Sequence, residues 1–178
     1  MFPFDRGLSS LVVTDEDTAQ ITACLQRLIA DSGARSSMLL DRAGQILAWE
    51  SDNARPEMQH LGALVAATYA SMQEMARLLN EDGFRTLLQE GMREKIFTET
   101  VQDQWLLVVI FDGQAKLGLI KVLAKRTSEV LANILEVVRQ RNAQVRKPRR
   151  SQVRKATTDT IDLLFKDDSG GTDGSSSA

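Results

Sequence analysis

Cysteine and histidine are almost absent from this 178-residue sequence, which contains one of each. The single Cys24 excludes an internal disulfide framework. With His60 as its one histidine, the chain lacks the Cys and His ligands of a structural zinc site and the base that a serine or cysteine nucleophile ordinarily uses. Carboxylate pairs such as Glu90 and Glu94 are more typical of a solvated helix face than of an acid–base site. We therefore predict no metal site and no catalytic residues.

Long apolar runs and phosphate-binding loops are also lacking. No stretch approaches the roughly 20 apolar residues that span a bilayer, and residues 1–6 have neither the basic start nor the apolar centre of a secretory signal. Gly113 and Gly118 have the separation of the glycines in a phosphate-binding loop, but Leu119 stands where that loop needs lysine. These absences predict a cytoplasmic protein with no nucleotide site of its own.

Charge is spread unevenly behind the net charge of −2. Residues 1–138 carry 13 basic and 19 acidic side chains, and residues 139–155 carry eight basic and no acidic ones. Residues 156–178 carry one lysine and five aspartates. The near-neutral total therefore conceals an acidic body, a basic stretch and an acidic end.

The predicted organisation is one domain (14–143) between an N-terminal extension (1–13) and a basic linker with a flexible tail (144–178). A solvated linker is the ordinary interpretation of such a basic run. Steering of an acidic partner is the functional alternative, favoured over nucleic-acid binding because no aromatic residue interleaves the run to stack on bases. The linker cations are Arg146, Lys147, Arg149, Arg150, Arg154 and Lys155.

The sequence of the first half of the domain predicts a helix, a hairpin and a second helix. Thr14 is the expected N-cap of a helix over 14–32 that Gly33 ends. Segments 36–41 and 45–50, separated by a tight turn at 42–44, have the strand–turn–strand signature of a hairpin. A long helix opens at Pro56 and runs to about Asn80. Its predicted inner stripe is Met58, Leu61, Val65, Thr68, Met72, Met75 and Leu79.

The sequence of the second half predicts a three-stranded meander and a last helix. A short helical turn passes through Leu87 and Leu88 to Gly91. Three strands follow, the second of them apolar throughout and so central in the sheet. The predicted strands are 95–100, 105–111 and 117–123, and the helix is 125–142. We therefore predict an α+β layered domain, a five-stranded antiparallel sheet with helices on its faces.

The long helix carries small residues on the side opposite its predicted inner stripe. These are Ala63, Ala66, Ala67 and Ala70. Alanine has the highest helix propensity, so an ordinary exposed face is one interpretation. The other is an interaction face, because small side chains let another surface approach the helix backbone closely.

A short segment at 157–165 combines acidic and apolar residues. Ile161, Leu164 and Phe165 follow the i, i+3, i+4 spacing of one helix face. About nine residues cannot hold a helix alone in water, so we expect the segment to fold on a partner. The alternative is a fortuitous apolar patch in a polar tail.

The order of elements, together with several short motifs, resembles the Roadblock/dynein light chain family. The motifs are Gly33-Ala34, the hairpin run Leu39-Leu40-Asp41-Arg42-Ala43-Gly44-Gln45 and Gln89-Glu90-Gly91. The most specific are Leu106-Leu-Val-Val-Ile-Phe-Asp112, then Leu117-Gly-Leu-Ile-Lys121 and Lys125-Arg126-Thr127-Ser128-Glu129. The resemblance covers about residues 14–142 and is closest to a bacterial branch that partners a small Ras-like GTPase. It implies a Roadblock/Longin-like fold.

The resemblance also implies a homodimer in which the third strands pair edge to edge, here through Lys95, Phe97, Thr98 and Glu99. The dimer would bind one GTPase and accelerate GTP hydrolysis without an arginine finger, so that GTP and Mg²⁺ belong to the partner. Bacterial polarity or motility, with concentration at a cell pole, is the implied setting, and other polarity proteins are a further partner class. The GTPase contact would fall on Ala63, Ala66, Ala67, Ala70 and Glu74, with 157–165 as a second contact that aids nucleotide exchange.

Glu74 departs from the family pattern, which tends to place a small residue there. The departure keeps an alternative function open. In that alternative the chain is a Roadblock-fold dimeric scaffold that binds polarity proteins without altering GTP turnover.

Overall fold

The computed structural model describes residues 11–53 and 57–165, with side chains up to residue 144. The chain divides into two units, Met1–Arg139 and Gln140–Ala178. The elements are α1 (Asp15–Ser32), β1 (Ser36–Asp41), β2 (Ile46–Ser51), α2 (Met58–Leu78), β3 (Thr86–Glu90), β4 (Glu94–Val101), the 3-10 turn η2 (Gln102–Gln104), β5 (Trp105–Asp112) and α3 (Leu117–Phe165). The predicted boundaries at 13/14 and 143/144 stay predictions.

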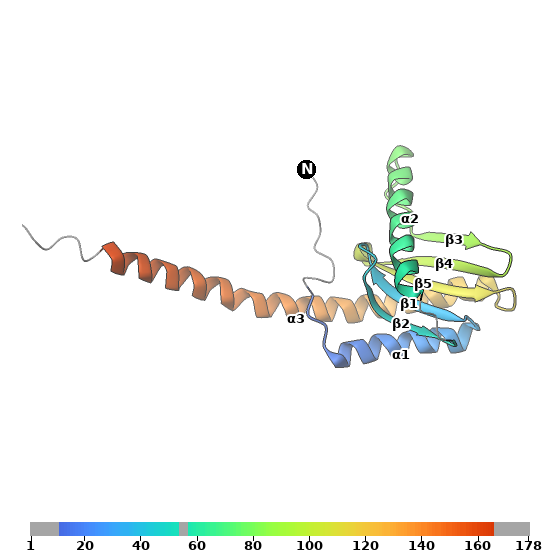
Figure 1. Ribbon diagram of the computed structural model, residues 1–178, viewed down its shortest axis with the longest axis horizontal. Helices are drawn as coiled ribbons and strands as arrows, with labels where there is room; N and C mark the ends of the chain where they lie inside the picture. The colour runs from blue at the N-terminus through green and yellow to red at the C-terminus, as the bar shows by residue number, and fades with distance from the viewer. Residues whose placement is uncertain (1–10, 54–56, 166–178) are drawn as a thin grey trace, which may run out of the picture. The chain divides into compact units, whose positions relative to one another are not determined.

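One antiparallel sheet organises the first unit, with strand order β2-β1-β5-β4-β3. Helix α2 lies on one face of the sheet, and α1 with the first turns of α3 lies on the other (Figure 1). The α+β layered class predicted from sequence is therefore confirmed, as are α1, the β1–β2 hairpin and the central position of β5.

The apolar run of β5 is explained by burial on both of its faces. Trp105, Leu107, Val109 and Phe111 belong to the core under α1 and α3. The alternate residues Leu106, Val108 and Ile110 belong to the core under α2. Because successive side chains of a strand point to opposite faces, a strand covered on both sides needs an apolar residue at every position.

Helix α1 begins at the predicted cap. The Thr14 hydroxyl accepts a hydrogen bond from the Asp17 backbone N–H at 3.3 Å, and the Asp17 carboxylate accepts one from the Thr14 N–H at 2.9 Å. This capping box satisfies two amides that the first helical turn leaves unpaired. Gly33 ends the helix in the left-handed conformation, with φ of 72°.

Residues Thr86–Glu90 form β3, where the sequence predicted a short helical turn. Strand β3 pairs with β4 across a turn in which the Gly91 N–H donates to the Glu94 carbonyl at 2.9 Å. Leu88 packs against the core of α1 and α3, whereas Leu87 packs against that of α2. Two adjacent leucines show no alternation by themselves, and the strand conformation is recognisable only from its pairing with β4.

This strand corrects the predicted dimer edge. Lys95, Phe97, Thr98 and Glu99 lie in β4, which pairs with β3 on one side and with β5 on the other. Phe97 and Thr98 are 1% and 2% exposed, so β4 offers no free edge. The prediction was wrong because it omitted β3, and β3 is the strand that lies at this edge of the sheet.

The predicted strand 117–123 is also wrong, because these residues are the first turns of α3. The alternation of Leu117–Leu123 fits a strand when it is read alone. Buried residues recur at Ile120, Ala124, Leu131, Leu135 and Val138, the spacing of one helix face that begins inside the segment. No helix among the residues described is long and apolar enough to cross a membrane.

Glu99 is a buried carboxylate between β4 and α3, with 7% of its surface exposed. Burial raises the pKa of Glu99, and Glu129 raises it further, while Arg85 and Lys125 lower it. A carboxyl whose pKa is higher in the folded state than in the unfolded state stabilises the fold at low pH. This stabilisation is lost as pH rises through the folded pKa.

Replacing Glu99 by glutamine is therefore expected to raise the free energy of unfolding at pH 7 and to flatten the fall of that free energy as pH rises from about 4.3, the ordinary pKa of a glutamate, to neutral pH. Urea unfolding across this range measures both effects. Glu81→Gln is the matched control, because Glu81 is exposed. A Glu99→Gln profile parallel to that of the wild type would contradict the expectation.

Candidate functional site

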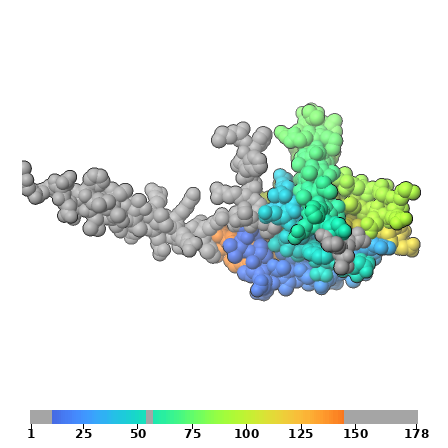
Figure 2. All heavy atoms as spheres, viewed as in Figure 1, coloured from blue at the N-terminus to red at the C-terminus, as the bar shows by residue number. Residues whose placement is uncertain are grey.

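The exposed half of α2 is the candidate interaction surface. Ala63, Ala67, Ala70 and Glu74 are all exposed, and their spacing of four, three and four residues places them in one row along the helix. Figure 2 shows α2, in green, as a ridge on this face of the molecule. The structure therefore brings four of the five predicted contact residues together in a row, which we call the small-residue row.

Ala66 does not belong to this row, because it is 5% exposed and packs in the core under α2. The buried face of α2 consists of Met58, Gly62, Val65, Ala66, Tyr69, Met72 and Ala76. Only Met58, Val65 and Met72 of these were in the predicted inner stripe. Small residues contribute to both faces of α2, so residue size alone could not distinguish the buried alanine from the exposed ones.

A close approach between α2 and the β1–β2 turn fixes where the row lies. Gly44 has φ of 84°, and a Cβ atom built on it would stand 2.8 Å from the Ala63 Cα. A Cβ atom on Gly62 would stand 3.1 Å from the Ile46 side chain and 3.2 Å from the Gly44 carbonyl. Two glycines thus let the helix backbone pack directly on the hairpin, which holds the N-terminal end of the row in place.

A second row on the exposed half of α2 carries large apolar side chains. Leu64, Met75 and Leu78 are 66%, 53% and 84% exposed, and Leu79, just past the helix, is 66% exposed. The sequence prediction missed this row because it assigned Met75 and Leu79 to the inner stripe. Met75, Leu78 and Leu79 are close together at the C-terminal end of α2, and Leu64 lies about three turns before them. Large apolar side chains that are this exposed are typical of a surface that another protein covers.

Two charged contacts border these rows. Glu74 forms an ion pair with Arg77 on the same helix, so the glutamate at the end of the small-residue row is partly neutralised. The Arg42 guanidinium lies over the Tyr69 ring, 5.6 Å from its centroid, and joins the hairpin turn to the buried side of α2.

The open edge of β3 lies beside the last turns of α2, which extend past it in Figure 1. Thr86, Gln89 and Glu90 on this strand are exposed. An unpaired strand edge presents free backbone donors and acceptors. Together with the apolar end of α2, this edge is a surface suited to pairing with another β-strand.

The C-terminal predictions fall on residues whose side chains lie outside the described part of the chain. The backbone of α3 continues to Phe165, so the basic linker and the 157–165 segment are helical there. The roles of the linker cations and of Ile161, Leu164 and Phe165 stay predictions. Pro56, the predicted first residue of the long helix, is also outside the described residues, and α2 begins at Met58.

Comparisons with known proteins agree with this fold. The family model of the Roadblock/LC7 domain matches residues 21–111. An MglB structure described as having a tetrameric arrangement superposes with a TM-score of 0.70 at 31% identity, covering 75% of this chain and 99% of that one. The gliding protein MglB of Thermus thermophilus gives 0.68 at 32% identity, over 74% and 98%. Myxococcus xanthus MglB gives 0.67 at 30% identity, over 72% and 96%.

A sequence comparison with curated proteins gives no match. The family model nevertheless covers β1, β2, α2, β3 and β4, the last two thirds of α1 and all of β5 except Asp112. Three MglB structures at about 30% identity cover most of the chain. The chain therefore belongs to the Roadblock/LC7 family, and its fold is that of MglB.

Proposed function

We propose that this protein is a homodimer that binds a small Ras-like GTPase of the MglA type through α2 and accelerates GTP hydrolysis. The observation that carries the proposal is the exposed row of Ala63, Ala67 and Ala70, in a fold shared with MglB. In this proposal the GTPase holds GTP and Mg²⁺ and supplies the catalytic groups, and this chain positions them. The setting is bacterial polarity or motility.

The two rows of α2 would contribute differently to such an interface. Alanine side chains let a partner backbone approach the helix closely. Leu64, Met75 and Leu78 beside them offer apolar area, each about 1.5–3 kcal/mol when fully buried. A GTPase loop on the small-residue row and a second subunit on the apolar end would together cover the exposed half of α2.

The proposed dimer pairs β3 with its copy in a second subunit. This arrangement satisfies the open backbone groups of β3 and buries the nearby Leu78 and Leu79, which are 84% and 66% exposed in the single chain. It keeps the edge-to-edge pairing that the family resemblance implies, and moves it from β4 to β3.

Acidic residues on β3 are expected to weaken this dimer. With Thr86→Glu and Gln89→Glu, each strand would carry three carboxylates with Glu90, and like charges on paired strands repel. We expect the dissociation constant to rise by about tenfold or more, and sedimentation equilibrium measures it.

The matched control replaces the same two residues by lysine, which complements Glu90 and should raise the constant much less. Equal dimer stability in the glutamate and lysine variants would place the subunit contact elsewhere.

The helical segment that contains Ile161, Leu164 and Phe165 is proposed as a second GTPase contact that aids nucleotide exchange. Support comes from its acidic-apolar sequence, which suits a groove on a partner. The basic linker before it is proposed to steer the acidic partner, an effect that salt should screen.

Phosphate release by an MglA-type GTPase, with and without this protein, tests the proposal. We expect acceleration of about tenfold or more if the chain positions catalytic groups in the GTPase. The alternative is a dimeric scaffold, which Glu74 favours because a charged, ion-paired side chain occupies the end of the small-residue row. A scaffold binds the GTPase and leaves the rate of phosphate release unchanged.

A further inference from the structure

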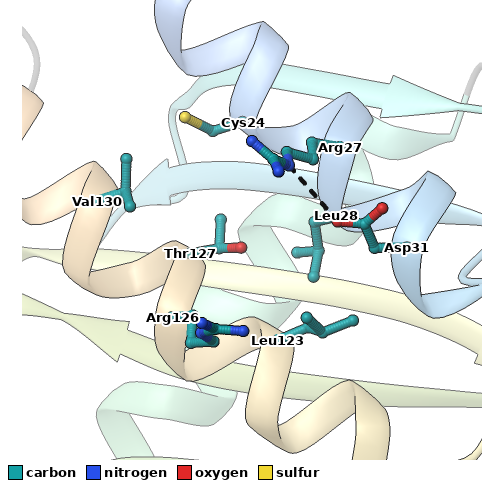
Figure 3. Close-up of a pocket in the computed structure, with 8 residues that line it drawn as sticks. All are labelled: Cys24, Arg27, Leu28, Asp31, Leu123, Arg126, Thr127 and Val130. Atoms are coloured by element: carbon teal, nitrogen blue, oxygen red, sulfur yellow. Dashed lines mark ion pairs between the residues drawn. The ribbon is translucent and has the colours of Figure 1, made fainter.

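A groove lies between α1 and α3, on the face of the sheet opposite to α2, and neither the proposed GTPase contact nor the proposed dimer uses it. Its volume is about 310 Å³. Figure 3 shows its two walls, with Arg27 entering from α1 and Arg126 from α3. The lining residues that bear on its chemistry are Cys24, Arg27, Asp31, Leu123, Arg126 and Val130.

An apolar stripe on α3 extends the groove along the helix. Leu119, Val122, Val130 and Val137 are 42%, 56%, 49% and 60% exposed. With Arg126 they fall within about 80° of one another on a helix of 3.6 residues per turn, on the side away from the buried residues. The stripe is about 27 Å long at 1.5 Å per residue, the length of a five-turn helix.

Charge distinguishes the α3 wall of this groove from the rest of the first unit. Residues 1–116 carry ten basic and seventeen acidic side chains, whereas residues 117–139 of α3 carry four basic and two acidic ones. Arg126 lies in the middle of the stripe, and Arg27 stands on the facing wall. Asp31 is the one acid in the lining and forms an ion pair of 3.5 Å with Arg27, so Arg126 provides the net positive charge of the groove.

We propose that the α1–α3 groove binds an acidic amphipathic helix of a partner protein. Its apolar side chains, at i, i+3 or i+4 and i+7, would cover Leu119, Val122 and Val130, and its Asp or Glu residues would face Arg126. Arg126 would lose contact with water when the stripe is covered, and a desolvated arginine needs an anion beside it. The charge of the groove therefore favours an acidic partner.

A second copy of this chain fits the groove less well. Antiparallel packing of two α3 helices across a two-fold axis aligns Leu119 with Val137 and places Arg126 near its own copy at the centre. Like charges brought together in a partly desolvated interface repel. The groove is therefore suited to a partner whose helix is acidic where α3 is basic.

Cys24 allows occupancy of the groove to be measured, because it is the one cysteine of the chain and lines this site. Burial raises the pKa of the Cys24 thiol, against the opposite effect of Arg27. Because Cys24 is also partly exposed, we expect its thiol in the free protein to react slowly with a thiol reagent such as DTNB. A helix seated in the groove would cover the thiol and slow the reaction further.

The experiment uses the full chain and two synthetic 18-residue helical peptides with the same leucine positions. One peptide carries glutamate beside the leucines, and the other carries lysine. We expect saturating acidic peptide to slow the modification of Cys24 by about fivefold or more, with binding that weakens as salt is raised. The basic peptide should have little effect.

Charge reversal by Arg126→Glu should exchange the preference, so that the basic peptide protects Cys24 and the acidic one does not. Arg93→Glu is the matched control, since Arg93 is exposed in the β3–β4 turn and makes the same charge change. Equal protection by both peptides, or none by the acidic one, would overturn the proposal. Protection that depends on protein concentration alone would also overturn it and assign the groove to a second copy.

Discussion

Arginine in place of Ala70 is expected to weaken binding of an MglA-type GTPase by about 30-fold or more, equivalent to about 2 kcal/mol. Ala70 is exposed near the middle of the small-residue row, so a long charged side chain there blocks close approach to α2 and must be desolvated in the interface. The fold should be unaffected because the position faces solvent. Titration calorimetry measures the affinity.

Ala19→Arg is the control for this prediction. Ala19 is an exposed alanine on α1, in the opposite layer of the domain, so the same substitution there should leave GTPase affinity unchanged. Thermal unfolding of both variants checks that neither disturbs the fold. Wild-type affinity in the Ala70→Arg protein would remove the small-residue row from the proposed interface.

The expected loss of affinity would also separate binding from activation. If Ala70→Arg lowers both the affinity for the GTPase and the rate of phosphate release, the small-residue row contributes to binding and to activation. If the wild type binds the GTPase and does not change phosphate release, the scaffold alternative holds. Glu74→Ala then tests whether the glutamate prevents activation, because the substitution removes the charge of Glu74 and its ion pair with Arg77.

Sequence reasoning predicted the parts of this fold whose signals are local. The N-cap at Thr14, the turn at Gly44 and the central strand β5, apolar at nearly every position, each depend on a few adjacent residues. The parts it missed depend on distant partners. Strand β3 is defined by its pairing with β4, and Leu117–Leu123 is helical because Ile120 and Ala124 continue a buried face that extends to Val138.

The same distinction explains the outcome for the candidate site. Exposed Ala63, Ala67 and Ala70 and buried Ala66 have the same side chain, and only the rotation of α2 on the sheet separates them. That rotation is set by contacts across the fold, with Gly44 and Gly62 at the hairpin and Tyr69 in the core. A helix with small residues on two faces does not indicate in its own sequence which face is buried.

Alanine in place of Gly44 is expected to lower the free energy of unfolding by about 2–5 kcal/mol. The left-handed backbone costs about 1–2 kcal/mol for a residue with a Cβ atom, and overpacking costs about 1–3 kcal/mol more. The added methyl group would stand 2.8 Å from the Ala63 Cα. A backbone atom cannot rotate away, so α2 must move from the hairpin, and the small-residue row moves with it. Urea unfolding measures the loss.

Gly33→Ala separates the two contributions, because Gly33 has φ of 72° and open space around its missing Cβ atom. It should cost only the backbone contribution of about 1–2 kcal/mol and leave GTPase binding unchanged, since it lies between α1 and β1. Gly44→Ala should weaken GTPase binding under conditions in which it remains folded. Equal losses of stability in the two variants would mean that the hairpin yields without moving α2. In that case the close packing at Gly44 would not be what positions the proposed interface.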